Sequence, residues 1–240
     1  MKTCSQSTKR FLILFIVIIL TFGVTGCMNN QPSREVVTAE ILAHLYEKYG
    51  VEFTVIDHVR GNGFTDLHVY PVDGCPIADR VRARRITYTY SDEVWFDDNF
   101  FGILIREDVE ADILSMLDEF LLEMKVFFHP SSTPFPRMFD GTKTYADLLQ
   151  WMNEGNHWSF RISIVIPANS LNDTEKEEYA EQIFNKLQVS GFVGSAMIRF
   201  SSNEIFERFT RANYNEFTGT YREVVSSFPL GNINLGNNRN

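Results

Sequence analysis

Apolar residues recur at helical spacing in several segments of the chain. Between Ser33, a good N-cap residue, and Gly50, a good residue just past a helix end, this spacing predicts a helix over about 34–49. A longer amphipathic run predicts a second helix over 107–124. Its buried face is expected to hold Val109, Ile113, Met116, Leu117, Phe120 and Leu121.

Two further helices are indicated by capping boxes, in which a side chain at the helix start and one three residues later bond each other's backbone. These patterns begin at Thr144 and Asn172, and predict helices that end near Trp151 and Leu187.

β-Branched and aromatic residues dominate most of the remaining segments. We expect strands at 52–58 and 64–72, joined by a turn at Gly61-Asn62-Gly63, because glycine supplies the positive φ that a tight hairpin needs. Further strands are expected at 79–90, 125–129, 157–166 and 192–200, while 206–228 mixes strand-type and helix-type residues. The pattern predicts an α+β fold: a mainly antiparallel sheet packed by three to four helices, preceded by a signal-peptide helix.

The first 26 residues have the layout of a signal peptide. Lys2, Lys9 and Arg10 precede an apolar run that extends from Phe11 to Val24. This run is shorter than the ~20 apolar residues of a membrane-spanning helix. An uncleaved signal anchor is the alternative interpretation.

The run ends in Val24-Thr25-Gly26-Cys27, which resembles the lipobox of bacterial lipoproteins. The resemblance implies cleavage before Cys27 and a diacylglyceryl lipid on its thiol, so that the protein is anchored at the extracytoplasmic face of a cell membrane. The segment from Leu45 to Phe53 is similar to one in small, uncharacterised lipoproteins of Gram-positive bacteria.

The predicted organisation has four parts: a lipoprotein signal peptide at 1–26, a tether at 27–33, a single α+β domain at 34–230 and a disordered tail at 231–240. Cleavage would leave 19 basic against 31 acidic residues, a formal net charge of −12. So acidic a chain is not expected to bind nucleic acid. With Cys27 lipidated, Cys75 would be the one remaining thiol.

Common catalytic and cofactor motifs do not occur in the sequence, which lacks the zinc-protease, nucleophile-elbow, phosphate-loop and Cys-x-x-Cys patterns. We therefore predict no catalytic, cofactor-binding or metal-binding residue, and the lipid on Cys27 as the one bound group. Asp57, His58, Asp66 and His68 could build a metal site if His58 lies opposite Asp66 across the hairpin; the alternative is a solvated strand face. His129 and His157 are expected to be surface or structural residues.

Two charged groups and several aromatic pairs remain open to more than one interpretation. Arg80, Arg82 and Arg84 share a strand face, beside Arg85, and could contact anionic lipids or wall polymers, or instead be solvated or paired internally. The predicted helix at 107–124 offers acidic partners, or a solvated acidic face: Glu107, Asp108, Glu110, Asp112, Asp118, Glu119 and Glu123. The pairs Trp95-Phe96, Phe100-Phe101 and Phe127-Phe128 suit the core or a ligand cleft, and Asp97-Asp98-Asn99 suits a turn.

Taken together, these features favour a membrane-anchored lipoprotein that acts as a non-enzymatic binding or interaction module of the cell envelope. Its partner would be a protein or an envelope polymer. The alternative is an extracytoplasmic hydrolase whose acidic site the sequence does not display.

Overall fold

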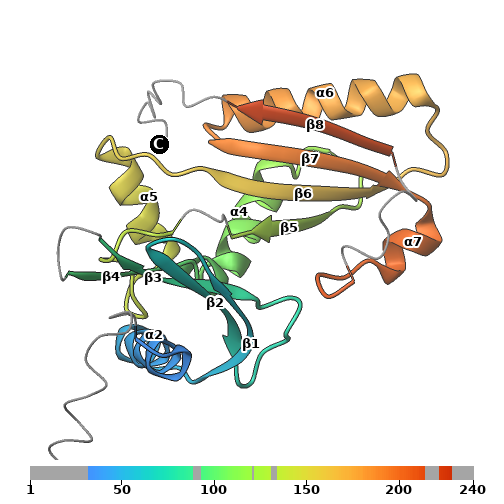
Figure 1. Ribbon diagram of the computed structural model, residues 1–240. Coiled ribbons are helices and arrows are strands. Elements are labelled where there is room, and N and C mark those ends of the chain that lie inside the picture. Colours follow the sequence, from blue (N-terminus) through green and yellow to red (C-terminus); the bar gives the residue numbers. More distant parts are fainter. Residues whose placement is uncertain (1–31, 89–92, 121, 131–133, 214–221, 229–240) are drawn as a thin grey trace, which may run out of the picture. The chain divides into compact units, whose positions relative to one another are not determined.

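The structure is a computed structural model that describes residues 32–88, 93–120, 122–130, 134–213 and 222–228 (Figure 1). The predicted signal peptide, Cys27 and the predicted tail lie outside these residues. The chain divides into two compact units, Met1–Val37 and Thr38–Asn240, and the description below concerns the second unit and helix α2 (Arg34–Tyr49), which begins in the first. Among the described residues, no helix is long and apolar enough to cross a membrane.

The first sheet is an antiparallel meander in the order β1 (Phe53–Arg60), β2 (Phe64–Pro71), β3 (Val81–Thr87) and β4 (Val94–Asp98). Alternating residues of β2 and β3 are fully buried, among them Leu67, Val69 and Val81. Helix α2 contributes its own buried residues, and its His44 ring stacks on Phe96 of β4 with centroids 4.7 Å apart. The predicted helix over 34–49 and the predicted pair of strands joined by a turn at Gly61-Asn62-Gly63 are therefore confirmed.

Two helices follow the meander, α3 (Phe101–Leu104) and α4 (Arg106–Met116). The buried positions Val109, Ile113 and Leu117 are confirmed, but the predicted end of the helix at 124 is wrong. After Met116 the backbone tightens, because the Leu117 N–H donates to the Leu114 carbonyl three residues back instead of four. Met116 and Phe120, expected to be buried, are only partly buried, and Leu121 lies outside the described residues.

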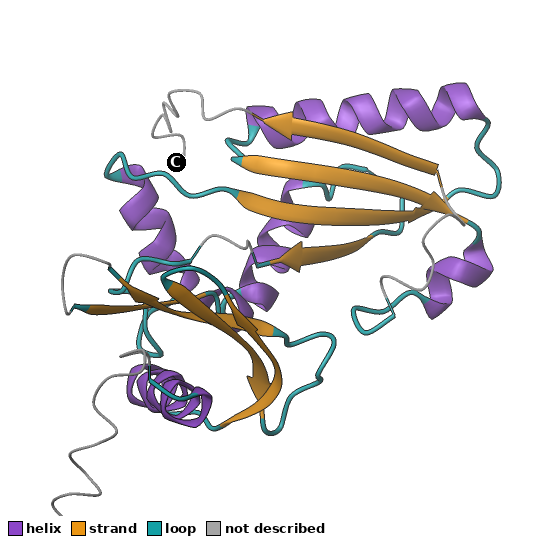
Figure 2. Cartoon of the chain, viewed as in Figure 1, coloured by secondary structure: helices purple, strands orange, loops and turns teal. Residues whose placement is uncertain are grey.

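The second sheet has the order β5 (Lys125–His129), β6 (Phe160–Pro167), β7 (Gly194–Ser201) and β8 (Arg222–Phe228). Strands β6 and β7 are parallel, with helix α6 (Asp173–Val189) as their crossover, and the other two pairings are antiparallel (Figure 2). Helix α6 buries Ala180, Ile183 and Leu187.

Two shorter helices complete the described part of the chain, α5 (Tyr145–Asn153) and α7 (Asn203–Arg208). Both predicted capping boxes are present, at Thr144 before α5 and at Asn172 before α6. The α+β class is confirmed. The described residues differ from the finer prediction in forming two sheets and six helices. Within the ambiguous segment 206–228, they include the end of α7 and the whole of β8.

Candidate functional site

The four residues considered for a metal site do not come together. Gly61 N–H donates to the Phe64 carbonyl at 3.0 Å, which closes a two-residue turn and places His58 opposite Leu67, not opposite Asp66 as the metal site would require. Asp57 instead lies opposite His68, at 3.7 Å between its carboxylate and the ring Nδ1. In the part of the chain that the structure describes, no group of three His, Cys, Asp or Glu residues is arranged to hold a metal ion.

The arginines in and just before β3 differ in their exposure and in their contacts with acidic side chains. Arg84 pairs with Asp66 through two hydrogen bonds of 2.5 and 2.8 Å, and its guanidinium lies 4.3 Å from the centre of the Phe64 ring. Arg85 is buried and bonds Glu40 of α2 at 2.6 Å. Arg80 is exposed, with its guanidinium 2.8 Å from the His68 ring, and Arg82 is partly exposed. Of the interpretations left open for this face, internal pairing therefore applies to Arg84.

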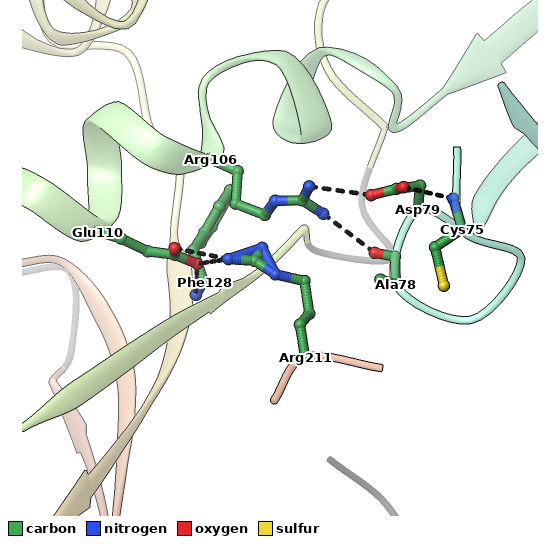
Figure 3. A network of polar contacts seen from close by, with 7 residues as sticks. All are labelled: Cys75, Ala78, Asp79, Arg106, Glu110, Phe128 and Arg211. Carbon is green, nitrogen blue, oxygen red and sulfur yellow. Dashed lines mark hydrogen bonds and ion pairs between the residues drawn. The ribbon is translucent and has the colours of Figure 1, made fainter. Parts of the chain in front are cut away.

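The acidic helix α4 is not simply a solvated face. Its Glu110 side chain is 13% exposed and accepts hydrogen bonds from the Phe128 N–H and from Arg211, at 2.6–2.8 Å (Figure 3). Burial raises the pKa of the Glu110 carboxyl, an effect that the Phe128 N–H and Arg211 oppose. Asp112 accepts a bond from the Tyr145 hydroxyl, and Glu119 pairs with Lys186 of α6.

Helix α4 also supplies Arg106, which forms a second ion pair. Arg106 lies 2.9 Å from Asp79 and donates to the Ala78 carbonyl, while Asp79 also accepts the Cys75 N–H at 2.7 Å (Figure 3). These contacts join α4 to the loop between β2 and β3. The positive charges of Arg106 and Arg211 equal the negative charges of Asp79 and Glu110. The arrangement is therefore suited to holding the segments together.

The aromatic pairs belong mainly to the core. Phe100, Phe101, Phe127 and Phe128 are buried, whereas Trp95 is 40% exposed. The prediction of a turn at Asp97-Asp98-Asn99 is wrong, because Asp97 and Asp98 are the last residues of β4. Asp98 is fully buried, where it accepts hydrogen bonds from Lys48 and Tyr49.

Of the two histidines expected to be surface or structural, His157 is exposed and His129 is partly buried on β5. The His129 Nε2 lies 3.1 Å from the Ser163 hydroxyl of β6. Desolvation, and after it the charges of Arg199, Arg161 and Arg211, lower the pKa of His129 to about 4. The ring is therefore neutral at pH 7.

This lowered pKa makes stability depend on pH. Between pH 6.5 and 4 the unfolded chain binds the proton at residue 129 and the folded chain does not, so the free energy of unfolding should fall as the pH drops. The slope from this one group is at most about 1.4 kcal/mol per pH unit. Urea unfolding at several pH values should show a shallower slope for His129→Gln than for the wild type; identical slopes would contradict the assignment.

An open groove of about 720 Å³ lies between α6 and the residues that follow α4. We call it the α6 groove; it is lined by Glu119, Phe120, Tyr179, Gln182, Asn185, Lys186 and Val189. The α6 residues recur at steps of three and four, beside the helix face that packs on the sheet. Its volume is within the usual range for small-molecule sites.

The polar groups of the α6 groove differ from those of the networks above. The two charged residues neutralise each other, since Lys186 Nζ lies 3.1 Å from the Glu119 carboxylate. Within the described residues, the side chains of Tyr179, Gln182 and Asn185 have no hydrogen-bond partner in the chain. This groove could not be recognised from the sequence, because polar residues at helical spacing on α6 do not reveal that Phe120 lies across from them.

No family model matches the sequence, and no curated protein matches it. Among solved structures, the chain is similar to the crystal structure of a DUF5037 family protein from Ruminococcus gnavus ATCC 29149, with 13% sequence identity and a TM-score of 0.44. The match covers 80% of this chain and 92% of that one. Likeness at this level assigns no family.

Proposed function

We propose that the protein is a lipoprotein held at the extracytoplasmic face of a cell membrane, where it acts as a non-enzymatic binding module of the cell envelope. The lipobox-like sequence Val24-Thr25-Gly26-Cys27, placed after a basic start and a short apolar run, supports the anchor. Two acyl chains on one cysteine would hold the protein stably, whereas one chain binds marginally.

The tether limits where such a module can act. Six residues separate Cys27 from Arg34, and fully extended they reach roughly 20 Å. The domain would therefore be held close to the bilayer surface.

The observation that carries the binding role is the α6 groove, which offers aromatic and amide groups without an available charge. A hydrolase of the acid-pair type needs two carboxylates that converge on one bond. Glu119 is the single carboxylate among the groove residues, and Lys186 pairs with it. The most buried carboxylates elsewhere in the described residues, those of Asp66, Asp98 and Glu110, are each bound to a cationic side chain.

The anchor is tested by mass spectrometry of the N-terminal peptide from membrane-extracted protein. We expect a peptide that begins at residue 27 and carries a diacylglyceryl group on its cysteine. In a Cys27→Ser variant the lipid should be lost and the protein released from the membrane. An N-terminus at Met1 with an unmodified Cys27 thiol in the wild type would overturn the proposal and leave a signal anchor in its place.

A further inference from the structure

We propose that the first sheet contacts the bilayer surface where β3 ends and β4 begins, through Tyr88, Val94, Trp95 and Arg137. We call these four residues the hairpin patch. The inference rests on the proposed lipid anchor at Cys27 and goes beyond it by stating which surface of the domain faces the membrane. Two observations support it: the course of α2 toward this end of the sheet, and the chemistry of the exposed side chains there.

The course of α2 along the first sheet is set by contacts within the second unit (Figure 1). Lys48, in the last turn of α2, bonds Asp98 at the end of β4, with 2.8 Å between Nζ and the carboxylate. One turn earlier, the His44 ring stacks on Phe96, two residues closer to the start of β4. Moving back along the helix therefore means moving toward the start of β4.

The next contact continues in this direction. Glu40 accepts a hydrogen bond from Arg85 of β3 at 2.6 Å, and the same guanidinium donates to the Thr87 hydroxyl at 2.6 Å. Thr87 is the last residue of β3 and lies opposite Val94, the first residue of β4. From the side of the anchor, the chain thus approaches the fold at the end of the sheet that carries the hairpin patch.

The lipid is close enough to bring this end of the sheet to the bilayer. The extended tether reaches roughly 20 Å, and α2 advances about 9 Å between Arg34 and Glu40. The lipid on Cys27 would therefore lie within about 30 Å of Glu40. So short a tether gives a surface group an effective concentration in the millimolar range, which makes a weak contact with the membrane sufficient.

The exposed side chains of the hairpin patch are of the types found at membrane interfaces. Trp95 is 40% exposed and Tyr88 is 50% exposed, and their rings lie edge to face with centroids 6.2 Å apart. Val94, next to Trp95 in β4, is 36% exposed. Tryptophan and tyrosine are enriched at the level of the lipid headgroups, because one end of each ring system is apolar and the other is polar.

The charges around Trp95 suit a zwitterionic headgroup. The exposed Arg137 guanidinium lies 4.0 Å from the centre of the Trp95 ring, and its N–H groups can bond a lipid phosphate while its flat face stays on the indole. Glu93 accepts the Trp95 indole N–H at 3.4 Å and balances the charge of Arg137. The contact therefore does not depend on anionic lipid, which a processed chain of net charge −12 would repel.

The test places the lipid-anchored protein in phosphatidylcholine vesicles whose acyl chains carry bromine, which quenches an indole that reaches them. Tryptophan fluorescence should be partly quenched relative to vesicles without bromine, and high salt should not abolish the quenching. Trp95→Phe should lose the quenched component. Trp151→Phe is the matched control and should keep it, because Trp151 is a partly buried residue of α5 outside the hairpin patch.

Tyr88→Ser tests the patch with Trp95 retained as the reporter. Removal of the second ring should lower the quenched fraction about twofold or more. Tyr46→Ser should leave the quenching unchanged, because Tyr46 is 55% exposed on α2 but lies between His44 and Lys48, near the opposite end of β4. Thermal unfolding establishes that each variant is folded.

A reporter on another face distinguishes a fixed orientation from free tumbling on the tether. The double variant Trp95→Phe/Val189→Trp moves the exposed indole to the end of α6, where residue 189 is 86% exposed. Its fluorescence should not be quenched.

Two results would overturn the inference: no quenching of the wild type, or equal quenching of the wild type and of the Trp95→Phe/Val189→Trp variant. Either result, together with a lipidated peptide that begins at Cys27, leaves the anchor standing. Failure of the anchor is seen separately, as a peptide that begins at Met1 and an unmodified Cys27 thiol.

Discussion

Replacing Asp98 with alanine is expected to lower the free energy of unfolding by about 3–5 kcal/mol, the usual cost of leaving a buried charge without its partner. The Asp98 side chain is fully buried, and the Lys48 side chain that pairs with it at 2.8 Å is 9% exposed. Removing the carboxylate leaves this ammonium group buried away from water and without its charged partner.

The loss extends beyond the ion pair. Asp98 also accepts hydrogen bonds from the Tyr49 hydroxyl at 2.6 Å and from the Phe100 N–H at 3.0 Å. Burial first, and then the Asp98 charge, raise the pKa of Tyr49, so its hydroxyl stays protonated and remains a donor. One carboxylate thus holds the end of α2 to the end of β4 and to the start of α3.

The measurement is urea unfolding, with Asp97→Ala as the matched control. Asp97 precedes Asp98 in β4 and is partly exposed, so its removal is expected to cost less than about 1 kcal/mol. Asp98→Asn should fall between the two, because the amide can still accept from Phe100 N–H but carries no charge for Lys48. Similar losses for Asp97→Ala and Asp98→Ala would contradict the role given to the buried network.

The elements that could be predicted from the sequence are those determined by residues close together in the chain. Thr144 and Asn172 each accept a hydrogen bond from the backbone N–H three residues later. The starts of α5 and α6 are therefore each determined by four consecutive residues. Helix α2 likewise matches its predicted bounds. The meander follows from short connections between strand-like segments.

The errors occur where distant residues decide the outcome. Apolar spacing continues past Met116 to Met124, yet α4 ends at 116. Asp98 is of a residue type that is common in turns, but in the structure it is held by Lys48, which is fifty positions away in the sequence. A one-residue difference in the turn at Asn62 was enough to move His58 away from Asp66. The α6 groove was missed for the same reason, since its two sides lie about sixty residues apart in the sequence.

The second large loss in the free energy of unfolding is expected when Gly194 is replaced by alanine. Gly194 begins β7 with φ +148°, and a Cβ built there would lie 2.0 Å from the Phe160 carbonyl oxygen and 2.7 Å from the Phe160 nitrogen. These are backbone atoms of the paired strand β6, so they cannot move aside as a side chain would. Gly194→Ala should therefore cost about 1–3 kcal/mol for the strained φ and about 1–3 kcal/mol or more for overpacking.

Gly155→Ala separates these two contributions. Gly155 has φ +91°, and a Cβ there would meet no atom within 4 Å, so alanine should add strain without a clash. Because both glycines have a positive φ, the difference between the two variants in urea unfolding then reports chiefly the close approach of β6 and β7. Because the Phe160 N–H also donates to the Val193 carbonyl at 2.9 Å, a larger residue at 194 must break the first contact of the one parallel pairing among the described strands. Equal losses for the two variants would mean that the strands can separate at this end without cost, and that glycine is needed at 194 for its backbone conformation only.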